Sequence, residues 1–189
     1  MADIVARAKA LLMQPAQEWP VIAAEPADTK GLILGYAAIL SLIPVVIGVI
    51  VPLLLGGMVL LHFGVGALLV HAVVQYALAL GSVWVVGKIV QTLSPMFGGI
   101  NDEVSAMKLS VYSPTASWVA SILILIPLVG WLLALLGLGY SIYLFYLGAR
   151  VVAKVPADKA VPFTVAVAIA AIVLAVVIGA ITARMFFWY

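Results

Sequence analysis

The distribution of charged positions is the most informative pattern along the chain. Between Gly31 and Gly87, 57 consecutive residues contain no Asp, Glu, Lys or Arg. A helix that crosses a bilayer needs about 20 apolar residues, so a run of this length must fold back on itself. Pro and Gly residues cluster at 52–66 and mark the turn. The pattern therefore predicts two spans, at about 31–51 and 65–90, and Pro44 is expected to kink the first.

Three more apolar runs follow a polar stretch at about 93–112, which is predicted to be a water-facing loop. Pro127 and Gly130 mark a tight turn between the first two runs, and Pro162 suits the first turn of the last helix. The first run is short for a full crossing, so a tilted or shallow path is also open. The predicted spans are 113–128, 130–149 and 162–185.

The N-terminal residues show a helical period of their own. Positions 4, 5, 8, 11 and 12 are apolar, whereas Asp3, Arg7 and Gln14 occupy the other face. This spacing predicts an amphipathic helix that lies on the inner membrane surface, packs against the protein's own cytosolic loops, or does both. The predicted fold is all-α. A cytosolic segment at 1–30 precedes a five-span membrane bundle at 31–189.

Composition and charge give the class of protein and its orientation. Of 189 residues, 67% are hydrophobic and 8% are charged, and the mean hydropathy is +1.32. A soluble chain of this size cannot bury so much apolar surface, so lipid must be its solvent. With the N-terminus in the cytoplasm, eight of the nine Lys and Arg residues lie inside, and only Arg184 lies outside. This asymmetry follows the positive-inside rule and places the C-terminus on the opposite side.

The sequence offers little that could perform catalysis or hold a cofactor. The absence of Cys excludes disulfides and thiolate metal sites, and no basic stripe suits nucleic acid. The predicted spans contain no Asp or Glu, which argues against a proton relay or an acid–base pair in the bilayer. His62 and His71 would lie on opposite faces of one helix and cannot share a metal. We therefore predict no catalytic residue, no cofactor and no metal.

Small residues at helical spacing are candidates for helix packing or for contact with a partner. Such ridges allow two backbones to approach closely, and hydroxyl groups can hydrogen-bond between helices. Because the chain is rich in Ala and Gly, chance ridges are the alternative interpretation. Whether a ridge faces another span or another protein stays open. The candidates are Gly31, Gly35, Gly137, Ser141, Ala171, Ala175, Gly179 and Ala183.

A second group of candidates belongs to the predicted cytosolic face. It consists of Trp19, Glu25, Lys108, Tyr112 and Lys159. These residues could form a docking surface, or the charges among them could simply be solvated groups that anchor the span ends. Glu25 is the strongest single candidate. We expect it to form a salt bridge to the central loop, with Lys108 as the partner.

Four sequence blocks, in order, resemble bacterial Yip1-family proteins over nearly the whole chain. Their residues are Pro15, Trp19, Ile22 and Glu25, then Gly98, Gly99, Lys108 and Tyr112, then Pro127, Gly130, Gly137, Tyr140 and Gly148, and finally Pro156 to Ala160. The resemblance implies a five-span helical protein of the bacterial inner membrane, with a cytosolic N-terminus and a periplasmic C-terminus. Eukaryotic relatives bind prenylated small GTPases. That role does not carry over, because only a short N-terminal segment stands here in place of their longer cytosolic region.

The expected function is that of a non-enzymatic membrane adaptor or organiser, or an accessory subunit of a larger membrane complex. Its expected partners are membrane lipids and other integral membrane proteins or a second copy of the chain, and not nucleic acid. The alternative is a small transporter, channel or lipid-moving protein. That function would need a polar path between helices, for which His71, Gln75, Ser82 and a few other hydroxyl groups are the candidates.

Overall fold

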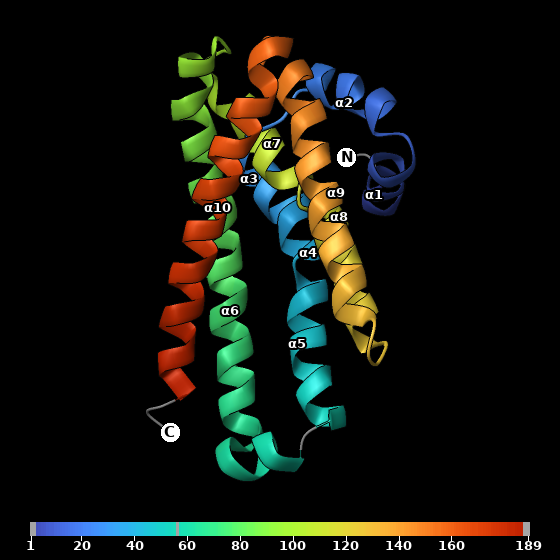
Figure 1. The fold of residues 1–189 in the computed structure, drawn as a ribbon, viewed down its shortest axis with the longest axis vertical. Helices are drawn as coiled ribbons and strands as arrows, with labels where there is room; N and C mark the ends of the chain where they lie inside the picture. Colours follow the sequence, from blue (N-terminus) through green and yellow to red (C-terminus); the bar gives the residue numbers. More distant parts are fainter. Residues whose placement is uncertain (1–2, 56, 187–189) are drawn as a thin grey trace.

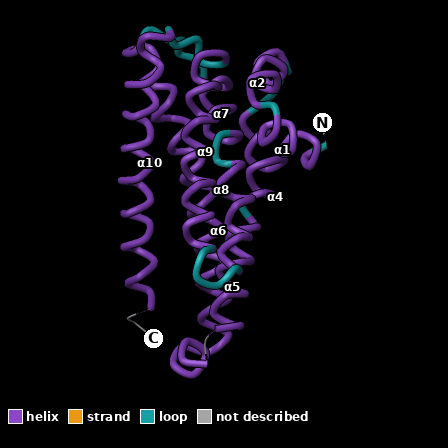
Figure 2. Tube along the Cα trace, turned by 45° about the vertical axis from the view of Figure 1, so that its right-hand side comes forward, coloured by secondary structure: helices purple, strands orange, loops and turns teal. Residues whose placement is uncertain are grey.

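The computed structural model describes residues 3–55 and 57–186, and every regular element in this part of the chain is a helix (Figures 1 and 2). The elements are α1 (Ile4–Met13), α2 (Pro15–Ala24), α3 (Thr29–Leu32), η1 (Ile33–Ala37), α4 (Ala38–Leu40), α5 (Leu42–Leu55), α6 (Gly57–Leu93), η2 (Ser94–Phe97), α7 (Glu103–Tyr112), α8 (Thr115–Ala120), η3 (Ser121–Leu125), α9 (Gly130–Val151) and α10 (Ala157–Phe186).

Four of the helical segments are long and apolar enough to cross a membrane. Within the described residues they are Thr29–Leu54, Gly64–Phe97, Gly130–Val151 and Ala157–Arg184. The predicted spans at 31–51, 65–90 and 130–149 each fall inside one of them. The last begins at Ala157, five residues before Pro162, so the expectation that Pro162 occupies its first turn was wrong.

The predicted span at 113–128 is a broken path rather than one long helix. Its residues form the 6-residue α8 and the 5-residue η3, followed by a turn into α9. At 1.5–2.0 Å of rise per residue these two helices reach about 19 Å, short of the roughly 30 Å hydrocarbon layer. In Figure 1 they lead down along α9 and end well above the α5–α6 turn. Length and hydropathy thus support four spans and do not confirm a fifth.

The polar stretch at 93–112 is only in part the water-facing loop that was expected: residues 101–103 are exposed, but the second half forms a buried helix. Asp102 begins α7 by accepting a hydrogen bond from the Ser105 backbone N–H at 2.7 Å, and every residue from 106 to 112 is buried. A Cβ at Gly87 of α6 would lie 2.8 Å from Met107 Cε. This close approach to α6 removes α7 from solvent.

Two long helices are interrupted by local backbone chemistry. The first long segment contains the π-helical turn η1 and a break at Ser41, just before Pro44, which has no N–H to donate to the Leu40 carbonyl. In α6, Gly64 adopts φ +71° and ψ 162°, a conformation that favours glycine. The helix that follows this kink begins close to the predicted start at residue 65.

The core lies at the end of the bundle that carries α1, α2 and α7, which we call the charged end (upper part of Figure 1). The largest fully buried side chains include Leu11, Trp19, Ile22, Leu109 and Phe163. Away from this end, α5, α6 and α10 leave many large apolar side chains exposed, including Leu54, Val73 and Val176. The parts of these helices far from the core thus expose apolar side chains instead of burying them within the protein.

Gly137 permits the close packing of α8 on α9, and this contact can be tested by substitution. A Cβ at Gly137 would overlap the Ala120 Cβ and lie 3.1 Å from the Ala116 carbonyl oxygen. Gly137→Ala should therefore lower the thermal unfolding temperature in detergent. The matched change Gly139→Ala, two residues along the same helix, has no neighbour within 4 Å. It should be neutral, or stabilising by up to about 1 kcal/mol through helix propensity. Equal effects of the two changes would contradict this packing.

A candidate site around Arg7 at the charged end

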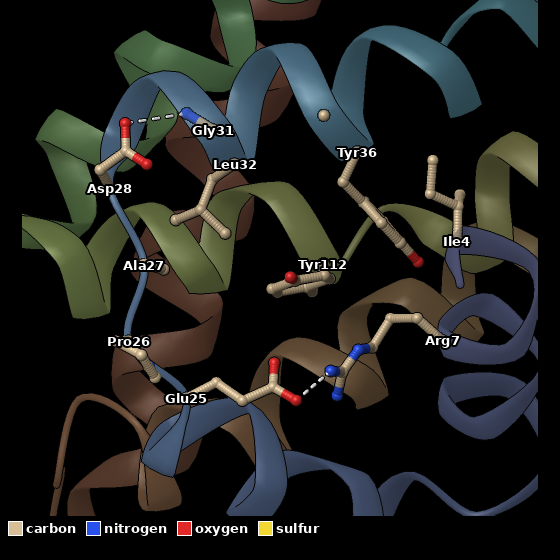
Figure 3. A pocket seen from close by; sticks show the side chains of 11 residues that line it. Ile4, Arg7, Glu25, Pro26, Ala27, Asp28, Gly31, Leu32, Tyr36 and Tyr112 are labelled. Atoms are coloured by element: carbon tan, nitrogen blue, oxygen red, sulfur yellow. Dashed lines mark hydrogen bonds and ion pairs between the residues drawn. The ribbon is translucent and has the colours of Figure 1, made fainter. Parts of the chain in front are cut away.

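Arg7 is the centre of the charged end and is buried, with only 5% of its surface exposed. Its Nη1 donates to Glu18 Oε1 of α2, and its Nη2 donates to Glu25 Oε1 where α2 ends. Figure 3 shows the contact with Glu25. Burial opposes the charge, but the hydrogen bond to Glu25 and the charges of Glu18 and Glu25 outweigh it, so the pKa of Arg7 is raised. The guanidinium therefore joins α1 to α2 as a permanent cation.

The position of Arg7 overturns one expectation for the N-terminal helix. Arg7 was placed on the polar face and Val5 on the apolar face, yet Val5 is 73% exposed. Ala8 and Leu11 are buried as expected. The Tyr140 hydroxyl donates to the Leu12 carbonyl oxygen at 2.9 Å, which ties α1 to α9. The buried face of this helix therefore packs against the protein itself, which is one of the two placements left open by the sequence.

Lys108 contacts the residue that was expected to be its partner, but through the backbone. Its Nζ donates to the carbonyl oxygens of Glu25 at 2.6 Å and of Ala23 at 3.2 Å. These carbonyls lie at the C-terminal end of α2. A cation there pairs with main-chain carbonyl oxygens that have no partner within the helix, and it complements the helix dipole. Burial lowers the pKa of Lys108, and the charges of Glu25 and Asp102 partly offset this. The expected carboxylate salt bridge is wrong, because the Glu25 side chain binds Arg7.

Trp19 fixes α2 on the bundle through its ring. The side chain is fully buried. A Cβ at Gly148 of α9 would lie 2.7 Å from Trp19 Cζ2 and 2.6 Å from Leu109 Cδ2. Only a residue without a side chain lets the indole lie this close to the α9 backbone. In the first resembling block, Trp19 and Ile22 therefore provide the packing, while Glu25 provides the ionic contact.

Tyr112 and Tyr36 connect α7 to the π-helical turn. Their ring centroids lie 4.6 Å apart in an edge-on arrangement. The Thr115 hydroxyl donates to the Tyr112 carbonyl oxygen at 2.6 Å, so the Tyr36 hydroxyl, 2.9 Å from Thr115 Oγ1, is the donor in that pair. The Arg7 guanidinium carbon also lies 6.0 Å from the Tyr112 ring centroid. The cation and both rings thus form one contiguous group.

This group borders a pocket of about 160 Å³ beside the start of the first long helix (Figure 3). Gly31 and Gly35 line it together with Arg7, Glu25, Asp28, Tyr36 and Tyr112. Gly31 donates its N–H to Asp28 Oδ2 at 3.1 Å, and a Cβ there would lie 2.6 Å from Asp28 Oδ1. Both glycines thus line a pocket that contains charged and hydroxyl groups. With two carboxylates, a guanidinium and two phenols, the pocket can receive a hydrogen-bonding or ionic group.

The structure separates the other candidates into three places. Gly137 and Ser141 face α8, where the Ser117 backbone N–H donates to Ser141 Oγ at 2.9 Å. Lys159 is exposed at the start of α10, and its Nζ would lie 3.9 Å from a Cβ at Gly98. The ridge on α10 points outward: Ala171 is half-buried, and Ala175, Gly179 and Ala183 are exposed.

Sequence reasoning missed the roles of Arg7, Glu18 and Tyr36. One signal was available, because Glu18 and Glu25 are seven residues apart and such a spacing places two residues on the same side of a helix. Two carboxylates on one side favour a single facing cation. No pattern in the sequence distinguishes Arg7 from Lys9 as that cation, although Lys9 is exposed.

Replacing Arg7 tests whether the charged end depends on it. Arg7→Met leaves Glu18 and Glu25 without their cation. Breaking a fully buried ion pair typically costs about 3–5 kcal/mol, and the cost here is smaller because 16% of the Glu18 side chain and 42% of the Glu25 side chain are exposed. We expect a fall in the thermal unfolding temperature and faster proteolysis within α1 and α2. Lys9→Met on the same helix is the control and should behave like the parent protein. Equal behaviour of the two variants would contradict a central role for Arg7.

Comparison with known families adds one finding. The family model of the Yip1 domain matches residues 9–179. The matched segment contains Trp19, Glu25, Lys108 and Tyr112, and it begins two residues after Arg7. No curated protein and no solved structure matches the chain.

Proposed function

This chain belongs to the Yip1 domain family, and we propose that it acts as a non-enzymatic adaptor or organiser in the bacterial inner membrane. It would bind other integral membrane proteins, or a second copy of itself, through the outer face of α10. The same features suit an accessory subunit of a larger membrane complex. Membership of the family and the four long apolar helices make it a membrane protein. The rest is our proposal.

The exposed ridge on α10 is the observation that carries this proposal. A Cβ at Gly179 would meet nothing within 4 Å, and Ala175 and Ala183 on the same side are exposed. Other residues of α10, among them Thr164, Val167 and Thr182, are buried. A helix in lipid gains little from apolar contact alone, whereas a ridge of small residues allows backbone contact with a second helix. The free ridge therefore suits a helix from another chain.

The charged end supports an orientation with the N-terminus in the cytoplasm. Arg7, Lys88 and Lys108 are held there by ionic or carbonyl contacts, and Lys88 Nζ lies 3.0 Å from Glu103 Oε1. Arg184 lies at the other end of α10. Cations gathered at one end follow the positive-inside rule. In this orientation the pocket beside Tyr36 and Tyr112 opens near the cytoplasmic membrane surface and adds a place for a cytosolic partner.

Transport is the second candidate function. His71 and Gln75 of α6 line a pocket of about 270 Å³ with Pro44 and Gly48 of α5. This pocket brings together two of the three residues expected for a polar path. Ser82, the third, lines a different pocket.

Site-specific photo-cross-linking in native membranes tests the adaptor function. A photoreactive residue at Ala175 or Gly179 should give discrete protein adducts, because both positions would face a partner helix. The same probe at Val173, an exposed position on another side of α10, should label lipid. The double change Ala175→Leu/Gly179→Leu should abolish the protein adduct formed by a probe at Ala183, and the control Val173→Leu/Ala180→Leu should leave it unchanged. Lipid adducts alone at Ala175 and Gly179 would overturn the proposal.

A further inference from the structure

A second pocket, of about 230 Å³, lies between α6, α7, α8, α9 and α10, below the charged end. Its walls are mostly apolar and include Val83, Leu109, Phe145 and Val167. The adaptor proposal makes no use of it. Its volume is below the roughly 300–1,000 Å³ of sites for drug-sized ligands, so it suits one chain segment with one polar group.

Hydroxyl groups are unusually frequent in this apolar lining, and all but one have a partner. Four donate to carbonyl oxygens of their own helices: Ser82 to Ala79 at 2.7 Å, Ser110 to Met107 at 3.1 Å, Ser117 to Pro114 at 2.8 Å and Thr164 to Ala160 at 2.8 Å. Ser141 Oγ accepts from the Ser117 N–H.

Ser113 is the exception. It lines the pocket and is 5% exposed, and its Oγ has no hydrogen-bond partner among the described residues. A buried hydroxyl without a partner costs free energy, so a group that accepts its hydrogen bond would stabilise the protein.

The depth of the pocket indicates the chemistry of such a group. Ser113 follows Lys108 by five residues, or about 7 Å of helix rise, and Ser82 precedes Lys88 by six residues, or about 9 Å. The pocket thus begins about one helical turn or more below the level of Lys88, which is partly exposed, and of Lys108, which is buried against α2. This is the level at which the ester groups of a lipid lie between the headgroup and the acyl chains. An ester carbonyl oxygen is an acceptor that a serine hydroxyl can bind.

The pocket also has a wall that reaches the surface of the bundle. Leu138 and Ile142 of α9 line it and are 48% and 40% exposed, and Ala168 of α10 is half-buried. In a membrane protein this surface faces the acyl chains of the bilayer. A lipid chain can therefore enter from the side, between α9 and α10, without leaving the membrane.

We propose that this pocket binds a segment of one acyl chain of an ester-linked membrane lipid, with the ester carbonyl oxygen accepting a hydrogen bond from Ser113. The chain lies against Val83, Phe145 and Val167, while the headgroup stays at the level of Lys88 and Lys108. The lipid would then fill the space between α10 and the rest of the bundle. Of the α10 ridge, only the half-buried Ala171 also lines this pocket. The exposed ridge residues Ala175, Gly179 and Ala183 do not, so the site does not depend on the adaptor function.

Native mass spectrometry of the purified full-length protein tests this proposal. The protein is mixed in mild detergent with equal amounts of ester-linked and ether-linked phosphatidylglycerol carrying chains of equal length. The ether lipid has the same headgroup but no carbonyl oxygen for Ser113. We expect one ester-linked molecule to be retained, with a preference of about fivefold, the size of one neutral hydrogen bond. Equal retention of the two lipids by the parent protein would overturn the assignment.

Three variants distinguish this site from lipid held elsewhere. Ser113→Ala should abolish the ester preference without lowering the unfolding temperature in lipid-free detergent, because it removes a hydroxyl that has no partner. Ala168→Leu narrows the pocket and should retain less of both lipids, whereas Ala170→Leu, two residues along α10 and outside the lining, should retain them as the parent protein does. A preference that persists in Ser113→Ala would refute the hydrogen bond. Unchanged retention in folded Ala168→Leu would refute the pocket.

Discussion

The arrangement of the charged end depends on one buried cation. Arg7 binds Glu18 within α2 and Glu25 just after it, and Lys108 binds the main-chain carbonyls at the end of the same helix. Without these contacts α2 would present unpaired carbonyl acceptors and the mostly buried Glu18 carboxylate to the core, which is costly. With them, Trp19 can insert against Gly148. The N-terminal helices thereby become part of the membrane bundle.

Burial is uneven along the molecule, and this unevenness connects the structure to its function. At the charged end, side chains from α1, α2, α7, α9 and α10 form one core. Farther along, α6 and α10 expose most of their apolar surface. A helix surface of this kind must be covered by lipid or by another protein. The ridge on α10 suits a protein helix and the pocket beneath Ser113 suits a lipid chain, so the two proposals assign different surfaces to different partners.

Sequence patterns predicted the parts of this protein that depend on local composition. The charge-free run from Gly31 to Gly87 predicted two long helices, and the structure has both. Asp102 was read as part of a loop, although its side chain caps α7. The reason is that α7 carries polar residues yet packs closely on α6 beside Gly87. Hydropathy averaged over a segment cannot detect a helix that is buried by its neighbours.

The sequence by itself determined that this chain dissolves in a membrane, where its long helices lie, and that its cations gather toward one end, because lipid imposes these features on every segment separately. Only the tertiary structure decided that Glu25 pairs with Arg7 while Lys108 takes the α2 carbonyls, and that Gly137 faces α8 while Gly179 faces outward. These outcomes depend on which helix faces lie together across dozens of residues. The spacing of small or charged residues shows which of them share a helix face. It does not show which other helix that face contacts, so it cannot assign their partners.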